Sequence, residues 1–106
     1  PRSDLPPREL AALERERLPC AELDRHVGQR AVVLGWLAAS RRVQTKDGRW
    51  MRFLTFEDES GLAEVVLFAD AYARHGQRLT QRGPFYARGR VEEKSGAVSL
   101  HADLLR

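Results

Sequence analysis

Cationic and aromatic side chains alternate in one short stretch of the chain, between positions 41 and 53. The two rings are Trp50 and Phe53, and Asp47 is the single acidic residue among them. Lys and Arg side chains hold phosphate groups, whereas aromatic rings stack on unpaired bases. The mixture therefore favours binding of a single nucleic-acid strand. The predicted phosphate contacts in this stretch are Arg41, Arg42, Lys46, Arg49 and Arg52.

The charge distribution is compatible with a polyanionic partner. The chain has 106 residues and a formal net charge of +3. Positions 1–30 carry six Arg and six acidic residues, which cancel, so the whole excess belongs to positions 31–106, with twelve Lys or Arg against nine acidic residues. Such an excess favours nucleic acids through counterion release, although a charge of +3 is also ordinary for a soluble domain.

No residue pattern indicates catalysis or metal binding. His26, His75 and His101 fall in three separate predicted elements, and Cys20 has no second cysteine to pair with. The acidic run 57–59 belongs to a tight turn, where neighbouring carboxylates diverge and Asp58 is better explained as an acceptor of backbone hydrogen bonds. We therefore expect no catalytic residue, no metal, no cofactor and no small-molecule substrate.

The length and hydropathy of the chain bound its organisation. One domain with a modest core fits 106 residues. No apolar run approaches the roughly 20 residues that cross a bilayer, and the first residues do not resemble a signal peptide, so we expect a cytoplasmic protein without a membrane partner. The sequence predicts a linker with short helices at 8–18 and 20–26 over positions 1–29, and the folded domain over positions 30–106.

The remaining pattern predicts five strands and one helix. Alternating or continuous apolar residues indicate strands over 31–40, 50–57, 62–68, 85–92 and 98–104, with a helix over 71–79. Gly35 and Gly89 mark sharp bends within the first and fourth strands. Three strands, a helix and two more strands form an all-β fold with minor helices, the five-stranded Greek-key OB barrel.

This barrel resembles the OB-fold domain of the bacterial DNA polymerase III alpha subunit and of its error-prone paralogue. The resemblance covers roughly positions 30–105. It implies contact with single-stranded DNA template, or RNA, in replication, translesion synthesis or repair. Other polymerase domains or replisome subunits would be its partners. The catalytic carboxylates of that family lie in another domain, so this chain is expected to be a binding module rather than an enzyme. The residues that carry the resemblance are Thr45, Lys46, Gly48, Met51, Phe53, Thr55, Glu57, Asp58 and Gly61, followed by Gly89, Arg90 and Val91.

Two other functions fit the same fold. The anticodon-binding barrel of class II aminoacyl-tRNA synthetases is similar in having a Gly-Trp pair in its first strand, as Gly35-Trp36 here, with Arg41 and Phe53 in the places of its Arg and base-stacking Phe. Alternatively, the barrel binds another protein of a replisome or mutasome, and a partner covers its open face.

Strand alternation selects the expected binding residues. It separates Phe53 from Leu54 and Phe56, which places Phe53 on the open face of the second and third strands, with Trp50 nearby at the loop edge. The opposing interpretation is that the N-terminal helix covers Phe53. On the fourth strand, Arg88 and Arg90 either extend the cationic track or pair with acidic residues: Glu92, Glu93 and Asp103.

Overall fold

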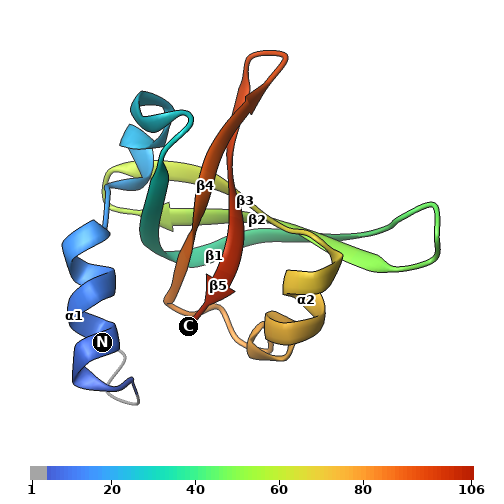
Figure 1. Ribbon diagram of the computed structural model, residues 1–106, viewed down its shortest axis with the longest axis horizontal. Coiled ribbons are helices and arrows are strands. Elements are labelled where there is room, and N and C mark those ends of the chain that lie inside the picture. The colour runs from blue at the N-terminus through green and yellow to red at the C-terminus, as the bar shows by residue number, and fades with distance from the viewer. Residues whose placement is uncertain (1–4) are drawn as a thin grey trace.

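The computed structural model of the chain describes residues 5–106, and its elements follow the predicted order (Figure 1). The first four positions of the expected linker lie outside the described residues. Within residues 5–106, no helix is both long enough and apolar enough to span a membrane. The elements are α1 Pro7–Glu16, η1 Cys20–His26, β1 Arg30–Gln44, β2 Trp50–Asp58, β3 Gly61–Leu67, α2 Ala69–His75, η2 Gly76–Arg78, β4 Phe85–Lys94 and β5 Ala97–Leu105.

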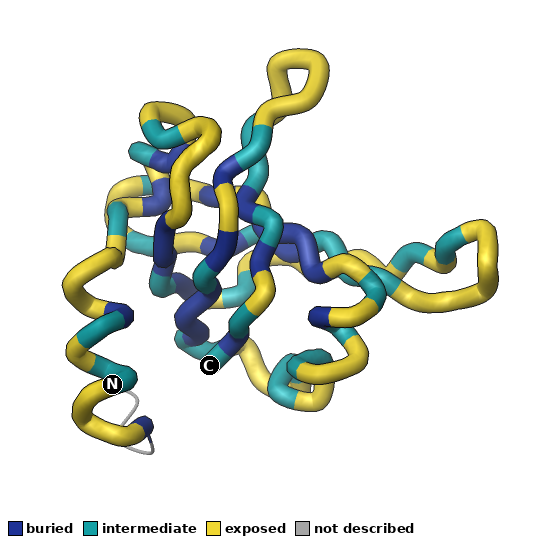
Figure 2. Tube along the Cα trace, in the orientation of Figure 1, coloured by how far each residue is buried: buried dark blue, intermediate teal, exposed yellow. Residues whose placement is uncertain are grey.

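The five strands close into the predicted OB barrel. Their order around the barrel is β1-β2-β3-β5-β4, and β4 pairs again with β1. Only the β3–β5 pairing is parallel, and the other neighbours are antiparallel. The first strand serves both sides of the barrel because it is long: positions 30–35 pair with β4, and positions 36–44 pair with β2. Two hairpins, β1–β2 and β4–β5, extend away from the barrel body and are exposed at their tips (Figures 1 and 2).

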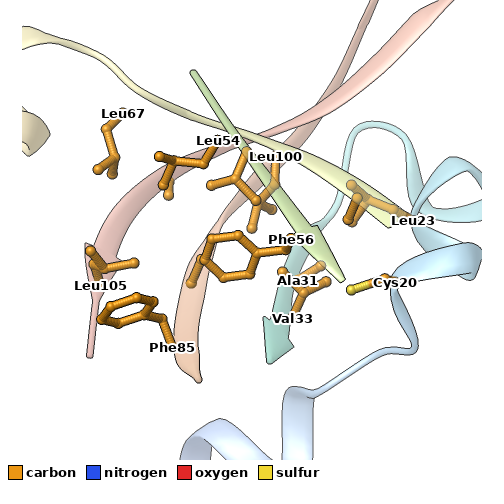
Figure 3. Close-up of a cluster of buried hydrophobic side chains, with 14 of the residues drawn as sticks. Cys20, Leu23, Ala31, Val33, Leu54, Phe56, Leu67, Phe85, Leu100 and Leu105 are labelled. Atoms are coloured by element: carbon orange, nitrogen blue, oxygen red, sulfur yellow. The ribbon is translucent and has the colours of Figure 1, made fainter. Parts of the chain in front are cut away.

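The barrel interior is filled by the predicted inward-facing residues. Leu54 and Phe56 of β2 are both fully buried, as alternation predicted, and Phe56 lies at the centre of the cluster in Figure 3. Phe85 and Val91 contribute from β4 and Leu100 from β5. Burying an aromatic or leucine side chain removes it from water at a gain of about 1.5–3 kcal/mol, so this cluster is the main stabilising feature of the barrel.

The N-terminal helix covers the outside of β1 and β4. Leu13 of α1 is fully buried against Val32 and Tyr86, in a second apolar cluster that is separate from the barrel interior. The Tyr86 hydroxyl also donates a hydrogen bond to the Glu14 carboxylate. The helix therefore packs on the side of the barrel formed by β1 and β4, not on Phe53.

Close backbone approach explains the two glycines that the sequence assigned to bends. A Cβ at Gly89 would lie 2.0 Å from the His101 carbonyl oxygen, and the β4–β5 register shifts between Arg88 and Gly89, as predicted. The shift turns Leu105 into the core, whereas unbroken alternation along the predicted strand 98–104 would place Leu104 there.

In β1, the irregularity falls between Leu37 and Ala39 rather than at Gly35. Gly35 is needed because a Cβ there would lie 2.8 Å from the Glu57 carbonyl oxygen.

The helix between β3 and β4 begins earlier than predicted. It starts at Ala69, two positions before the predicted start, with Phe68 as its N-cap. Tyr72 and Leu79, from the predicted helical span, pack against the barrel core.

Asp58 ties the β2–β3 turn to η1. Its carboxylate accepts hydrogen bonds from the backbone amides of Ser60 at 2.8 Å and Cys20 at 2.9 Å, which confirms its structural role in the turn. Burial raises the pKa of Asp58, but these hydrogen bonds and one from the Ser60 hydroxyl outweigh burial, and the net pKa is lowered. Burial, together with the nearby Asp58 charge, raises the pKa of the Cys20 thiol to about 12.

Candidate nucleic-acid interface

The predicted binding residues occupy two opposite faces of the β1–β2 hairpin. Arg41 pairs with Phe53, and Arg42 pairs with Arg52, one position further along each strand. Successive side chains of a strand point to opposite faces, so these two pairs face away from each other. The cationic stretch that is continuous in sequence is therefore divided in space.

The Phe53 face lies on the outside of the barrel and is open. Phe53 is partly buried, and the Arg41 guanidinium carbon lies 4.7 Å from the centroid of its ring. This distance is within the range of a cation–π contact. Phe53 is thus neither sealed in the core nor covered by α1.

A single row of side chains crosses the strands at the level of Phe53. The paired positions are Arg41 with Phe53, Phe53 with Val66, and Val66 with His101. Directly paired residues in adjacent strands share one face of a sheet, so the row follows the outer face of the barrel, and Val66 within it is buried. The row continues from His101 to Arg90 and ends at Arg30. It therefore begins and ends with guanidinium groups and carries rings and an apolar residue between them.

A hollow lies beside this row, between β2, β3 and the β4–β5 hairpin. Its wall includes Phe68, which is 47% exposed, and His101; their ring centroids are 4.9 Å apart at an interplanar angle of 73°. This is an edge-to-face aromatic pair. The lining residues are Met51, Phe53, Val66, Phe68, Glu92, Glu93, Lys94, Ser95, Ala97, Ser99 and His101.

The other face of the hairpin carries Trp50, Arg42 and Arg52, beside α2. The Arg42 guanidinium carbon lies 4.1 Å from the Trp50 ring centroid, and Trp50 is 39% exposed. Arg52 donates hydrogen bonds to Ser40 at 2.6 Å and to the Tyr72 hydroxyl at 3.2 Å. Arg52 is therefore held by its neighbours, whereas Trp50 and Arg42 form a stacked exposed pair.

The loop between β1 and β2 is internally bonded. The Thr45 hydroxyl accepts a hydrogen bond from the Arg49 amide at 3.1 Å, and Gly48 adopts a φ of 86°, which favours glycine. Lys46 is exposed in this loop. Arg49 turns toward α2 and donates to Asp70 at 2.6 Å, and this hydrogen bond raises the pKa of Arg49 and lowers the pKa of Asp70.

The two arginines of β4 differ in their surroundings. Arg90 forms an ion pair with Glu92 at 3.2 Å on an exposed surface. Exposed ion pairs contribute little to the free energy of folding, about 0–1 kcal/mol, so this pair can open at small cost. Arg88 is partly buried and pairs with Val32 of β1 and Leu104 of β5, away from the row.

Sequence reasoning did not select Phe68 and His101. Alternation does place both on outward faces, but their proximity depends on the parallel pairing of β3 with β5, which joins strands distant in the chain. Among residues 5–106, no group of three or more His, Cys, Asp or Glu side chains is arranged to hold a metal ion.

Comparisons with known proteins agree with this geometry. A family model described as an OB-fold nucleic acid binding domain matches residues 31–106. The error-prone DNA polymerase of Symbiobacterium thermophilum is 36% identical over 84 residues, which cover 77% of this chain and 8% of that protein. The DNA polymerase III subunit alpha of Haemophilus influenzae is 31% identical over 75 residues, covering 69% of this chain and 6% of that protein. The polymerase resemblance expected from the sequence is thereby confirmed.

A solved structure shows the same fold. Asparaginyl-tRNA synthetase from Pyrococcus horikoshii superposes with a TM-score of 0.70 at 19% identity, covering 86% of this chain and 22% of that chain. At this identity the similarity concerns the fold alone. The chain spans less than a tenth of the length of the polymerases it matches.

Proposed function

This chain belongs to the family of OB-fold nucleic-acid-binding domains, and we propose that it binds single-stranded DNA as a module of a bacterial C-family DNA polymerase. The observation that carries the proposal is the outer row with Arg41 at one end, Phe53 and His101 within it, and Arg90 toward the other end. Cations that flank partly exposed rings match the alternation of phosphate and base along a single strand.

The proposed mechanism is positioning, without any bond made or broken. Phe53 stacks on an unpaired base, while Arg41 and Arg90 neutralise phosphates on either side. A duplex would hide its bases from Phe53, so the row favours single strands. Each phosphate contact adds salt dependence and little sequence preference.

The remaining predicted residues form a second part of the proposed interface. Trp50, Arg42 and Arg52 lie on the hairpin face beside α2, and Lys46 stands in the connecting loop. A nucleic-acid strand that extends beyond Phe53 would reach these residues by passing around the edge of the β1–β2 hairpin. Arg49 and Arg88 belong to the same proposed set, with weaker expected effects because Arg49 is bonded to Asp70 and Arg88 lies outside the row.

In the parent polymerase, the proposed role is to hold template strand for the polymerase centre. This role is supported by the identity with the matching segments of an error-prone DNA polymerase and a DNA polymerase III alpha subunit. Other domains of the polymerase or replisome subunits are the proposed protein partners.

Fluorescence anisotropy tests the proposal. Labelled oligo-dT is titrated with the chain at 50 mM and 200 mM salt, with wild type and Phe53→Ala compared. We expect salt-sensitive binding that Phe53→Ala weakens about 5-fold or more, since stacking on one aromatic ring contributes about 1–3 kcal/mol per base. Absence of binding at 50 mM salt would refute the proposal. Tighter binding of a folded RNA stem-loop than of oligo-dT would favour the anticodon-reading alternative instead.

A further inference from the structure

We infer that Phe68 and His101 form a second base-binding position, distinct from the one at Phe53. This inference rests on the proposed function and extends it, because it assigns the hollow beside the row to a second unpaired nucleobase of the same strand.

The strand order separates His101 from Phe53. Val66 of β3 pairs with Phe53 of β2 on one side and with His101 of β5 on the other. Neighbouring strands lie about 4.8 Å apart, so Phe53 and His101 are separated by two strand spacings, roughly 10 Å. Stacked bases are about 3.4 Å apart. This separation leaves room for one base at Phe53 and a second at Phe68 and His101, along the hollow that all three rings line.

The ring of Phe68 is exposed, which packing of the barrel core does not require. Phe68 is 47% accessible to solvent, although the adjacent Leu67 is fully buried in the core. Its edge-to-face contact with His101 fixes the two rings relative to each other, and almost half of the Phe68 surface stays accessible. A preformed ring with an open face is what base stacking requires.

The lining of the hollow favours a base over a phosphate. It is largely uncharged, with apolar side chains from Met51, Val66 and Ala97, and its charged members are Glu92, Glu93 and Lys94. Glu92 is paired with Arg90, and the charges of Glu93 and Lys94 offset each other, so no uncompensated Lys or Arg of the lining attracts a phosphate. The guanidinium groups of the row are the backbone contacts, and the uncharged base is the part of a nucleotide that enters.

The test compares three alanine variants at exposed apolar or aromatic positions. Phe68→Ala and His101→Ala remove the proposed ring pair, and Leu62→Ala is the matched control because Leu62 is also in β3 and is 56% exposed. With oligo-dT in the anisotropy assay, we expect each of the first two variants to bind at least 3-fold more weakly and Leu62→Ala to bind within 2-fold of wild type.

A second measurement works on the unmutated chain. Oligo-dT carrying one 5-iodouracil at successive positions is photocrosslinked, and the attachment sites are identified by mass spectrometry. The inference predicts crosslinks at Phe53 from one position and at Phe68 or His101 from another. Wild-type affinity in both ring variants, with Phe53→Ala still impaired, would overturn this inference and leave the proposed function standing. Failure of the wild-type chain to bind oligo-dT would overturn both.

Discussion

Arg41 lies over the ring of Phe53, with its guanidinium carbon 4.7 Å from the ring centroid, and the two residues are directly paired across β1 and β2. The contact joins the proposed phosphate-binding group and the proposed base-stacking group. In the proposed complex, a base stacked on this face of Phe53 would displace the guanidinium, and the phosphate next to that base would attract it.

Removal of the Arg41 charge should alter the salt dependence of binding. Neutralising one phosphate contributes about 0.7 to the slope of log affinity against log salt for a single strand. Arg41→Gln is therefore expected to reduce the slope for oligo-dT by about this amount. Anisotropy titrations at several salt concentrations measure the slope. Arg15→Gln is the control, because Arg15 is exposed on α1, outside the row; an equal reduction in both variants would argue that only total charge matters.

The two faces of the β1–β2 hairpin should contribute unequally to the binding of oligo-dT. Phe53 lies in the row between Arg41 and Val66, whereas Trp50 lies on the opposite face and is already stacked with Arg42. We expect Phe53→Ala to weaken binding of oligo-dT by at least 5-fold and Trp50→Ala to weaken it less. Competition titrations with one labelled oligonucleotide measure both. A larger effect at Trp50 would place the main binding face beside α2.

Most of the barrel could be predicted from the sequence, because inward-facing apolar residues alternate clearly with outward-facing residues along its strands. Leu54 and Phe56 were assigned to the core and Phe53 to the open face, and the structure has them there. The helix before Gly28 was predicted with its observed bounds, 20–26. In these segments, apolar residues face the core and the residues between them face outward. Alternation with a period of two residues is therefore enough to predict which way each side chain points.

The grouping of the cations could not be predicted in the same way. Arg41 and Arg42 are neighbours in sequence, but alternation sends them to opposite faces, and the bulge between Leu37 and Ala39 sets which face each one takes. Likewise, His101 comes close to Phe68 only through the parallel β3–β5 pairing. Both features depend on register between strands, which local patterns do not specify.

Gly89 should be intolerant of any side chain. An added Cβ would lie 2.0 Å from the His101 carbonyl oxygen and 2.7 Å from the Ala102 Cα, and both atoms belong to the backbone of a paired strand. We expect Gly89→Ala to lower the free energy of unfolding by about 3 kcal/mol, the upper end for overpacking. Gly96→Ala is the matched control: its Cβ meets open space, and only its φ of 83° costs energy, about 1 kcal/mol. Urea unfolding of both variants measures the difference, and equal losses would contradict the close approach at Gly89.

Asp58 should stabilise the fold only while it is ionised. Its hydrogen bonds outweigh burial and hold its pKa below the ordinary value of 3.8, so the folded state favours the carboxylate. The stabilisation is present above the unfolded-state pKa and is lost as the pH falls through the lower folded-state pKa. We expect Asp58→Ala to lower the free energy of unfolding by about 2 kcal/mol at pH 7. The difference in free energy of unfolding between wild type and Asp58→Ala should become smaller below pH 4.

The pH dependence of urea unfolding from pH 3 to pH 7 checks this expectation. Glu57→Ala provides the comparison, because Glu57 is the exposed residue that precedes Asp58 at the end of β2. A gap between wild type and Asp58→Ala that stays constant down to pH 3 would show that the carboxylate charge does not matter.

The most direct test of the binding face is amide chemical-shift mapping by NMR with the isotope-labelled chain and unlabelled oligo-dT. The largest changes are predicted at the paired residues of the row, Phe53, Val66 and His101, with little change at Trp36 of β1 and Leu62 of β3, which are exposed outside the row. Changes confined to Trp36, Leu62 and their neighbours, with Phe53 and His101 unaffected, would contradict the account.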